Sequence, residues 1–388
     1  MRALLYKWNN YFADIVTELL TSYGIEYDEF SWQFDDYEND EAFEKWFRDN
    51  ISGADYDFTL SINYWPLIST MSREKCLKYI SWCYDCPLNV MNPELTLGND
   101  NNYVFMFDRK QCSDYEDLGI DRVYHLPLGF NERAAREFHY LSDKLQKYET
   151  QISLVGSLYE SQLPLILSGV NNDTRSIFNE LVHAQEDRYD INIINECIDD
   201  EIVEYINSQY ESITPEGTEA FRVSRKALIY ATFAEVTRRN RLTILNLLGR
   251  RYSTDLYSFQ SFDKLDGVNQ RGQVDYRTEM PYVFRASKIS LNPVLRCIET
   301  GIPLRAFDIM GYGGLLFSSF QPELAEEYRD GEDCVIYNSY EEALDKAAFY
   351  LSHEDIRQRI VKNGYDKTVR NHTLGKCFDR ILRTARVI

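Results

Sequence analysis

The sequence predicts an α/β protein built from two doubly wound domains in series, with a helical insertion in the second domain. In the first third of the chain, short apolar runs alternate with amphipathic helical stretches, which is typical of parallel βαβ units. A second alternation of this kind begins with the apolar run that starts at Gln151. The chain has 388 residues, 44% of them hydrophobic and 14% aromatic, which suits two domains with separate cores.

The first domain is expected to span residues 1–149. Short β-branched or aromatic runs predict its strands, and Gly24 ends its first helix. The expected strands are 3–6, 25–30, 57–62, 78–82, 103–107 and 122–126, and the expected helices are 11–23, 38–50 and 132–146.

The second domain is expected to span residues 150–365, with the boundary placed at 148–150. Its first strand, 151–155, runs into a Gly156–Ser157 turn, and region 160–250 is expected to be mostly helical. Residues 366–388 are expected to form a helical tail that crosses back to the first domain. The further expected strands are 254–259, 288–292, 314–318 and 334–337, and the further expected helices are 217–248, 304–311, 339–351, 355–364 and 374–386.

Composition excludes several classes of partner. The formal net charge of −20 repels nucleic acid and anionic lipid surfaces, although a local pocket can still be basic. No run of about 18 apolar residues predicts a transmembrane segment, and the N-terminal stretch does not read as a signal peptide. The eight cysteines are too scattered for a disulfide framework, so a reduced, cytoplasmic protein is expected.

The segment 287–319 carries the strongest chemical pattern. A strand ends at Asn292, and a loop containing Gly301 then leads into a helix that begins at Leu304. A helix N-terminus offers unpaired N–H groups that suit a diphosphate, and Arg305 in its first turn adds a cation. One turn later, Asp308 either accepts hydrogen bonds from the two hydroxyls of a ribose or is an ordinary exposed helix residue. Gly313 and Gly314 either let backbone approach the ligand or serve as an ordinary helix C-cap.

The same segment resembles a known family. The run G-I-P-L-R-A-F-D, the Gly pair that enters a strand, P-E-L, G-E-D-C-V-I-Y, Y-L-S-H and a closing H-T resemble the C-terminal domain of CgeB-type, spore-protein glycosyltransferases. Upstream, I-S-W, V-F-M-F-D-R and L-P-L-G look like the N-terminal domain usually fused to it. The resemblance covers most of the chain and is weakest over 160–250.

This resemblance implies the GT-B fold, in which two Rossmann-like domains face a central cleft. The second domain would bind a nucleotide diphosphate sugar, and the first would bind an acceptor hydroxyl on a glycan, protein or cell-surface molecule. In such enzymes an acidic pair eight residues apart contacts sugar and ribose. Asp308 matches the second member, whereas Thr300 replaces the first and Glu299 is adjacent. Backbone N–H groups around Gly301 are expected to take over part of the contact to the sugar. No cofactor or metal is expected, because GT-B enzymes usually need none.

The remaining site candidates come from positions after strands. Gly156 and Ser157 are expected to approach the diphosphate, or they form an ordinary βα turn. A helical Arg cluster, in which Arg238 is the preferred ligand and Arg239 and Arg241 are neighbours, either presents cations to the same ligand or is a solvated or domain-facing basic cluster. Asp85 is the preferred general base, and it serves alternatively as a turn cap before Pro87.

Asn9 and Asn10 are expected to contact the acceptor. Two other functions stay open for the chain: a GT-B nucleotide-sugar epimerase, and a non-catalytic spore or surface relative. The W-C-x-x-C run at 82–86 is not interpreted as a redox motif, because Pro87 follows directly and the βαβ order does not suit that fold.

Overall fold

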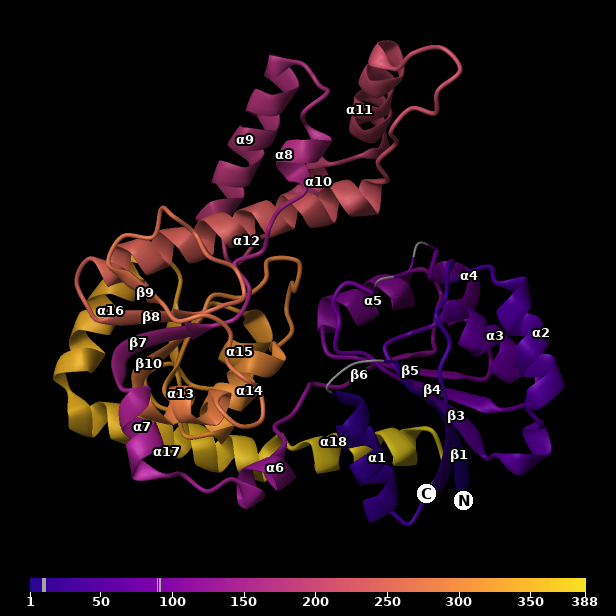
Figure 1. Cartoon of the computed structure of the whole chain (residues 1–388), viewed down its shortest axis with the longest axis horizontal. Helices are drawn as coiled ribbons and strands as arrows, with labels where there is room; N and C mark the ends of the chain where they lie inside the picture. Colours follow the sequence, from indigo (N-terminus) through magenta and orange to yellow (C-terminus); the bar gives the residue numbers. More distant parts are fainter. Residues whose placement is uncertain (9–11, 89, 91) are drawn as a thin grey trace. The chain divides into compact units, whose positions relative to one another are not determined.

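The computed structural model describes residues 1–8, 12–88, 90 and 92–388 (Figure 1). The chain divides into two compact units. The first holds 1–131, 300–304 and 371–388, and the second holds 132–299 and 305–370. Each unit contains one six-stranded sheet in which all paired strands are parallel. The two doubly wound α/β domains predicted from the alternation of strands and helices are therefore confirmed.

The sheet of the first unit has the order β2-β1-β3-β4-β5-β6. The direction in which strands are added reverses at β1, because β2 lies on one side of it and β3 to β6 lie on the other. Open parallel sheets bind ligands at the carboxyl edge beside such a reversal. The strands are β1 (Arg2–Tyr6), β2 (Glu26–Phe30), β3 (Phe58–Ile62), β4 (Lys78–Trp82), β5 (Asn102–Met106) and β6 (Val123–His125). The helices before β6 are α1 (Phe12–Ser22), α2 (Glu41–Asn50), α3 (Pro66–Glu74), α4 (Glu94–Leu97) and α5 (Arg109–Asp117), with a 3-10 turn at Gly53–Asp55.

Alternate residues of these strands point into two cores, one on each face of the sheet. One core gathers aromatic side chains of β1, β2 and α2, including Tyr6, Phe30 and Phe43. The other core is closed by the last helix of the chain, α18 (Leu374–Thr384), which buries Phe378 and Ile381 against α1 and the sheet. Residues 371–388 thus belong to the first unit.

The sheet of the second unit has the order β12-β11-β10-β7-β8-β9. Its strands are β7 (Thr150–Val155), β8 (Thr254–Tyr257), β9 (Val268–Gln270), β10 (Ser287–Asn292), β11 (Leu316–Ser319) and β12 (Val335–Tyr337). The helices outside the insertion are α6 (Glu132–Glu137), α7 (Ser142–Lys147), α13 (Met280–Ala286), α14 (Leu304–Gly311), α15 (Pro322–Glu327), α16 (Tyr340–Ser352) and α17 (Glu354–Asn371).

The helical insertion follows β7 and has its own apolar core. Figure 1 shows its shorter helices lying against the 25-residue helix α12. Phe178, Val182 and Ile206 pack there against Leu228 and Phe233 of α12. The insertion consists of α8 (Leu163–Ile166), α9 (Asn172–Glu186), α10 (Ile194–Cys197), α11 (Asp200–Ile213) and α12 (Arg225–Gly249).

Four elements differ most from the sequence expectations, and one of them is α12, which begins at Arg225 and not at the expected residue 217. The single helix expected over 132–146 is two short helices, because residues 138–141 leave the helix and Phe138 and Tyr140 pack on Tyr282. Strand β9 was not expected, and α17 runs seven residues beyond the expected end at Gly364 to Asn371. The second unit begins at Glu132, ahead of the expected boundary at 148–150. Within the described residues, none of the helices is long and apolar enough to cross a membrane.

Candidate active site

The turn after β7 is built at the carboxyl edge of the second sheet. Gly156 has φ +151°, a conformation that side chains rarely adopt, and its N–H donates to the Tyr257 carbonyl over 3.0 Å. Ser157 Oγ donates to Gln260 Oε1 over 2.9 Å, and the Leu158 N–H donates to the same oxygen over 2.6 Å. One amide side chain from the segment after β8 therefore fixes the predicted Gly156–Ser157 turn.

Arg241 of α12 reaches this turn and is buried, with 8% of its surface exposed. Its Nε and Nη2 donate to the Pro293 carbonyl over 3.1 and 2.7 Å, and its Nη1 donates to the Ser157 carbonyl. Its guanidinium lies 4.8 Å from the centre of the Tyr159 ring. Among the described residues, no carboxylate forms an ion pair with Arg241, and burial lowers the pKa of its guanidinium.

Arg238, the preferred cation of this helix, is engaged elsewhere. Its guanidinium makes two hydrogen bonds to the buried Glu235 carboxylate, over 2.9 and 2.6 Å, and lies over the Phe262 ring. Arg239 shares the same carboxylate over 2.9 Å. Arg238 and Arg239 thus share the Glu235 carboxylate, and Arg239 also pairs with Glu186 over 3.7 Å. It is Arg241, three residues along the helix from Arg238, that contacts Ser157 and the Gly156 turn.

Asn292 ends β10 at the same edge, as expected. Its Nδ2 donates to Ser318 Oγ over 3.0 Å, and Ser318 Oγ donates to the Asn292 carbonyl over 3.1 Å. The next residue, Pro293, supplies the carbonyl that holds Arg241. The ends of β7 and β10 and the middle of α12 are thereby tied together in the second unit.

Thr300 and Gly301 are held instead by Asp108, within the first unit. Asp108 caps α5 by accepting from the Gln111 N–H over 3.1 Å. Its carboxylate also accepts from the Thr300 N–H over 3.0 Å and from the Gly301 N–H over 3.2 Å. A Cβ on Gly301 would lie 2.7 Å from the Phe107 carbonyl oxygen, so this close approach requires glycine. Thr300 and Gly301 thus belong to the first unit, whereas Gly156 and Arg241 belong to the second.

Arg305 and Asp308 form a pair on α14. Arg305 Nη1 lies 3.3 Å from Asp308 Oδ2, and the Tyr276 hydroxyl donates to Asp308 Oδ1 over 2.9 Å. Asp308 is 2% exposed, and burial raises its pKa to about 6, against the opposing effects of Arg305 and Tyr276. Both carboxylate oxygens thus have partners, and a ribose at Asp308 would compete with the Tyr276 hydroxyl.

Gly313 and Gly314 lie at the opposite edge of the sheet from the Gly156 turn. They end α14, with the Gly314 N–H bonded to the Ile309 carbonyl over 2.8 Å, and they precede the start of β11 at Leu316. Gly313 has φ +75°, and a Cβ there would collide with the Arg285 guanidinium. The two glycines therefore serve as a helix C-cap and a close packing contact, as their alternative interpretation stated.

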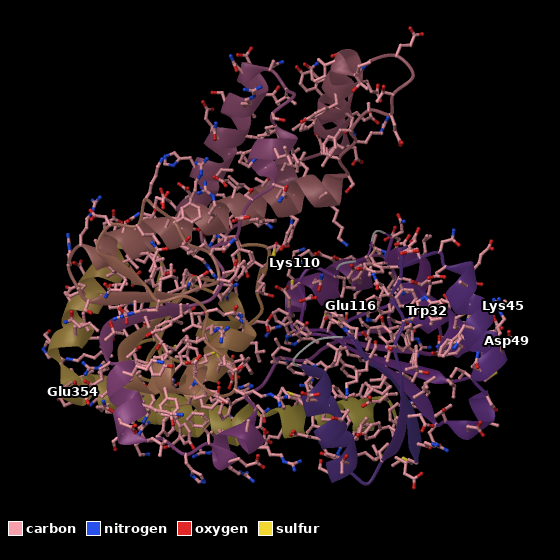
Figure 2. The ribbon with its side chains drawn as sticks, in the orientation of Figure 1. Trp32, Lys45, Asp49, Lys110, Glu116 and Glu354 are labelled. Carbon is pink, nitrogen blue, oxygen red and sulfur yellow. The ribbon has the colours of Figure 1, made fainter. Side chains whose placement is uncertain are left out.

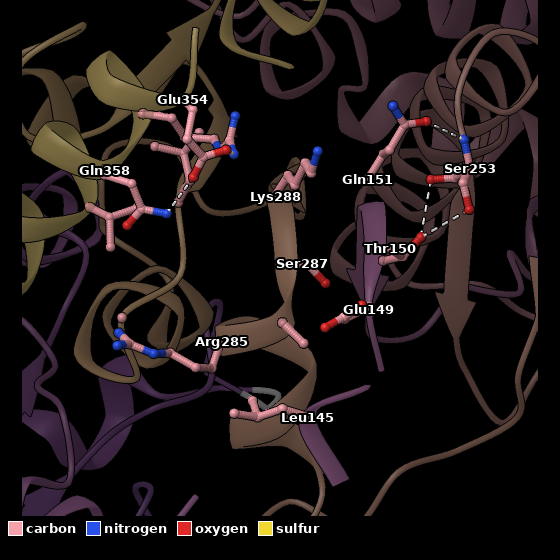
Figure 3. A pocket seen from close by; sticks show the side chains of 15 residues that line it. Leu145, Glu149, Thr150, Gln151, Ser253, Arg285, Ser287, Lys288, Glu354 and Gln358 are labelled. Carbon is pink, nitrogen blue, oxygen red and sulfur yellow. Dashed lines mark hydrogen bonds and ion pairs between the residues drawn. The ribbon is translucent and has the colours of Figure 1, made fainter. Parts of the chain in front are cut away.

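A pocket of about 700 Å³ lies at this amino-terminal edge (Figure 3). It is lined by residues at the starts of β7 and β10, including Thr150 and Ser287, and by Gly313. In Figure 3 Arg285 and Lys288 lie beside the start of β10, and Glu354 and Gln358 come from α17. The pocket is separate from the residues that surround Arg241.

Asp85 lies after β4 in the first unit. It accepts from Asn63 Nδ2 over 2.6 Å, while Asn63 Oδ1 accepts from the backbone N–H groups of Tyr84 and Asp85 over 3.0 and 3.2 Å. Burial raises the pKa of Asp85, and the Asn63 bond opposes that shift. Asn9 and Asn10 lie outside the described residues.

Several residues of these sites were not found by sequence reasoning. Gln260, Asn63 and Tyr276 are single polar residues in loops or at strand ends, and no motif marks them. Asp108 belongs to the V-F-M-F-D-R run, but that run gave only a resemblance and no site role. The signal for Arg241 was present, because it belongs to the Arg cluster of α12. The helical period does not separate the two arginines, because Arg238 lies seven residues before the buried Leu245 and so faces nearly the same side. Only the tertiary contacts with Pro293 and Ser157 distinguish Arg241.

Two units with parallel sheets and flanking helices, the last helix of the chain belonging to the first unit, define a protein of the GT-B class. Residues 219–383 match the family model described as "Glycosyl transferase-like". The chain is therefore a glycosyltransferase of the GT-B fold. No curated protein matches the chain.

Solved structures share this fold over the whole chain. Sucrose-phosphate synthase from Thermosynechococcus elongatus has a TM-score of 0.56 and 12% identity, over 100% of this chain and 98% of that one. HepE from Anabaena, in complex with UDP and glucose, has a TM-score of 0.57 and 9% identity, over 100% of both chains. A glycosyltransferase from Rickettsia africae has a TM-score of 0.55 and 10% identity, over 99% of this chain and 97% of that one. Identities this low establish the fold.

Proposed function

We propose that this glycosyltransferase moves a sugar from a nucleotide diphosphate sugar to an acceptor hydroxyl, as CgeB-type enzymes are expected to do. Two findings support a nucleotide sugar as donor. The glycosyl transferase-like match covers most of the second unit, and HepE, which shares the fold, is described in complex with UDP and glucose. The eight cysteines are all thiols, which suits a reaction in the cytoplasm.

The observation that carries the proposal is the environment of Arg241. The acceptors of this buried guanidinium are neutral carbonyls, so its positive charge is not compensated by a carboxylate. In such a low-dielectric environment it attracts an anionic ligand strongly. Within the described part of the chain, three N–H bonds of this guanidinium have acceptors, and the other two are proposed to bind a phosphate oxygen. The turn at Gly156 lets the backbone approach the same ligand without a side chain. A diphosphate at this edge would supply the negative charge that Arg241 lacks.

In the proposed reaction Asp85 accepts the proton of the acceptor hydroxyl. The hydroxyl oxygen forms a bond to the anomeric carbon of the donor sugar, and the bond from that carbon to the diphosphate oxygen breaks. The electron pair leaves with the nucleoside diphosphate, whose charge Arg241 stabilises. Such a single displacement inverts the anomeric configuration. The proposal assigns no bound metal, because the guanidinium supplies the positive charge.

In this scheme Gly156, Ser157, Asn292 and Arg241 serve the diphosphate side, and Asp308 is proposed for the ribose after Tyr276 gives up its bond. Arg305 is proposed to hold Asp308 in place. Thr300 and Gly301, bound by Asp108, remain proposed for the sugar side of the donor, where Thr300 replaces an acid.

A thermal-shift screen with UDP, GDP, CDP and their sugars tests the proposal. At least one nucleoside diphosphate is expected to raise the melting temperature, since a ligand that binds the folded state stabilises it by mass action. Slow hydrolysis of the matching nucleotide sugar without acceptor, followed by mass spectrometry, would then identify a transferase. Conversion of the sugar to its epimer would instead indicate an epimerase. If no nucleotide shifts the melting temperature, the proposal is wrong and a non-catalytic relative is favoured.

A further inference from the structure

Tryptophans gather at the carboxyl edge of the first sheet. Trp8 lies two residues after β1, Trp32 two residues after β2, and Trp65 three residues after β3, while Asp85 lies three residues after β4. These strands are neighbours in the order β2-β1-β3-β4 and are all parallel, so their carboxyl ends share one edge. Trp32, labelled in Figure 2, donates through its Nε1 to Asp40 Oδ2 over 2.9 Å, which ties it to the N-cap of α2.

Trp8 and Trp65 form a fixed pair. Their Nε1 atoms donate to the same acceptor, the Ile62 carbonyl, over 3.3 and 3.0 Å. Their ring centres lie 5.9 Å apart, with the planes at 69°. Both residues are only partly buried, and the ring of Trp65 also packs against those of Tyr6, Phe34 and Tyr37. The accessible indole surface is the part of each ring that its packing contacts leave uncovered. Because hydrogen bonds fix both rings, a ligand would not have to order them on binding.

The tryptophan pair is joined to Asp85 through a single residue. Asn63 follows Ile62, adopts φ +58°, and donates to Asp85 Oδ2 over 2.6 Å. The Ser61 hydroxyl donates to the Asn63 carbonyl over 2.7 Å and so stabilises this turn. Two aromatic rings, an amide and a carboxylate are thereby fixed around residues 62 and 63.

We propose that the acceptor is a carbohydrate, whose ring stacks on the exposed indole surface of Trp8 and Trp65 while one of its hydroxyls is bound by Asp85 and Asn63. This inference rests on the proposed glycosyl transfer and names its acceptor. A sugar ring has C–H groups on its faces and hydroxyls around its rim. The C–H groups are attracted to the negative face of an aromatic ring, and the hydroxyls require acceptors and donors such as a carboxylate and an amide. The first unit presents these two kinds of group side by side.

Saturation-transfer NMR on the full chain tests the inference, with a panel of methyl glycosides as probes: the α and β forms of glucoside, galactoside, mannoside, rhamnoside and N-acetylglucosaminide. At least one of them is expected to show saturation of ring C–H protons. Trp8→Ala is expected to weaken the affinity for that sugar at least five-fold. Trp8→Phe is expected to retain part of it, because a smaller aromatic face remains.

The control is Phe349→Ala, which removes a 44% exposed aromatic side chain from α16 of the second unit. Phe349→Ala should leave sugar binding unchanged. Trp8→Ala and Phe349→Ala should both show the wild-type shift in melting temperature with nucleotide, which verifies that they are folded. The inference is overturned if no glycoside gives a signal, with or without nucleotide, or if Trp8→Ala binds as well as the wild type. Nucleotide binding without sugar binding would overturn this inference alone. Sugar binding without any nucleotide response would overturn the proposed function instead.

Discussion

Arg241 illustrates how much a single buried charge depends on its environment. Its guanidinium is bonded to two carbonyls and packed on Tyr159, whereas Arg238, on the same helix, is neutralised by Glu235. The two arginines differ by three positions, but only Arg241 lies next to the Gly156 turn. They therefore provide a matched pair for testing the diphosphate site.

Arg241→Lys is expected to weaken nucleoside diphosphate binding about 10- to 100-fold, since a charge-assisted hydrogen bond contributes roughly 1.5–3 kcal/mol. Arg238→Lys is expected to change the affinity less than two-fold, because Arg238 already serves Glu235. Calorimetric titration of both variants measures the difference. Equal losses in the two variants would remove Arg241 from the diphosphate site.

Asp85 has a raised pKa because it is desolvated, and a base must be ionised to accept a proton. We therefore expect kcat to fall as the pH decreases through this raised pKa. Asp85→Asn should lower kcat about 10²- to 10⁴-fold and remove that acidic limb, while the KM for the donor stays near its wild-type value. A pH–rate profile measures both effects. An Asp85→Asn variant with the wild-type profile would show that Asp85 only caps the turn before Pro87.

Asp308 makes a prediction for stability without any ligand. Its pKa of about 6 lies above the ordinary value of 3.8, so the folded state holds the proton more tightly than the unfolded state does. Its contribution to stability is therefore present at low pH and is lost as the pH rises through 6. Relative to Asp308→Asn, the wild type should lose about 1 kcal/mol of unfolding free energy between pH 5.5 and 7.5. Urea unfolding at the two pH values measures this, and parallel curves would contradict it.

At the scale of elements, α18 has the clearest energetic role. It begins at the Thr373 N-cap and buries Leu374, Phe378, Ile381 and Leu382 against α1 and the sheet of the first unit. Burying such side chains stabilises a protein by about 1.5–3 kcal/mol each. The backbone also pairs there, because the Phe130 N–H donates to the His372 carbonyl over 2.9 Å and the Leu374 N–H to the Phe130 carbonyl.

Removal of residues 372–388 is therefore expected to unfold or aggregate the first unit. The burial energy lost with these side chains is comparable with the 5–15 kcal/mol stability of a typical domain. The truncation also exposes an apolar face of the sheet to solvent. Limited proteolysis with mass spectrometry should show rapid cleavage within residues 1–131 of the truncated chain. An unchanged digestion pattern would mean that α18 is dispensable for the first unit.

The sequence predicted most elements because their patterns are local. Strand β4 and helix α14 have the expected bounds, since a buried run or an amphipathic period marks each of them. The break between α6 and α7 was not predictable in this way, because it depends on Tyr282, a residue about 140 positions further along the chain, against which Phe138 and Tyr140 pack. The three-residue strand β9 is too short to carry a period, and only its pairing with β8 defines it.

The candidate site divides in the same way. Gly156, Ser157, Asn292 and Asp85 follow strands, and the parallel topology alone places such residues at a carboxyl edge. Gly313 and Gly314 lie at the amino-terminal edge, which the sequence could not indicate because a glycine-rich turn has the same pattern at either edge of a sheet; their donor-binding role stays a prediction. The Trp8–Trp65 pair and the Asn63–Asp85 bond depend on tertiary contacts between β1, β3 and β4, which no single segment of the sequence displays.

At the scale of the whole molecule, the diphosphate and ribose of the donor are assigned to the second unit and the acceptor to the first. Thr300 and Gly301, which are proposed for the donor sugar, also belong to the first unit. Each assignment rests on groups within its own unit: Arg241 and the Gly156 turn in one, and Asp85 with the tryptophan pair in the other. The pocket in Figure 3, at the amino-terminal edge of the second sheet, has no part in this scheme. The location of a bound nucleotide therefore tests the account as a whole.

Hydrogen–deuterium exchange with and without the nucleotide that stabilises the protein gives that location. We expect protection to be concentrated in residues 155–161, 257–262 and 292–298, which surround Arg241 at the carboxyl edge. Arg241→Lys should reduce this protection at the same nucleotide concentration, whereas Arg238→Lys should not. Protection confined to 285–288, 313–315 and 354–361, around the amino-terminal pocket, or to the first unit alone, would contradict the account.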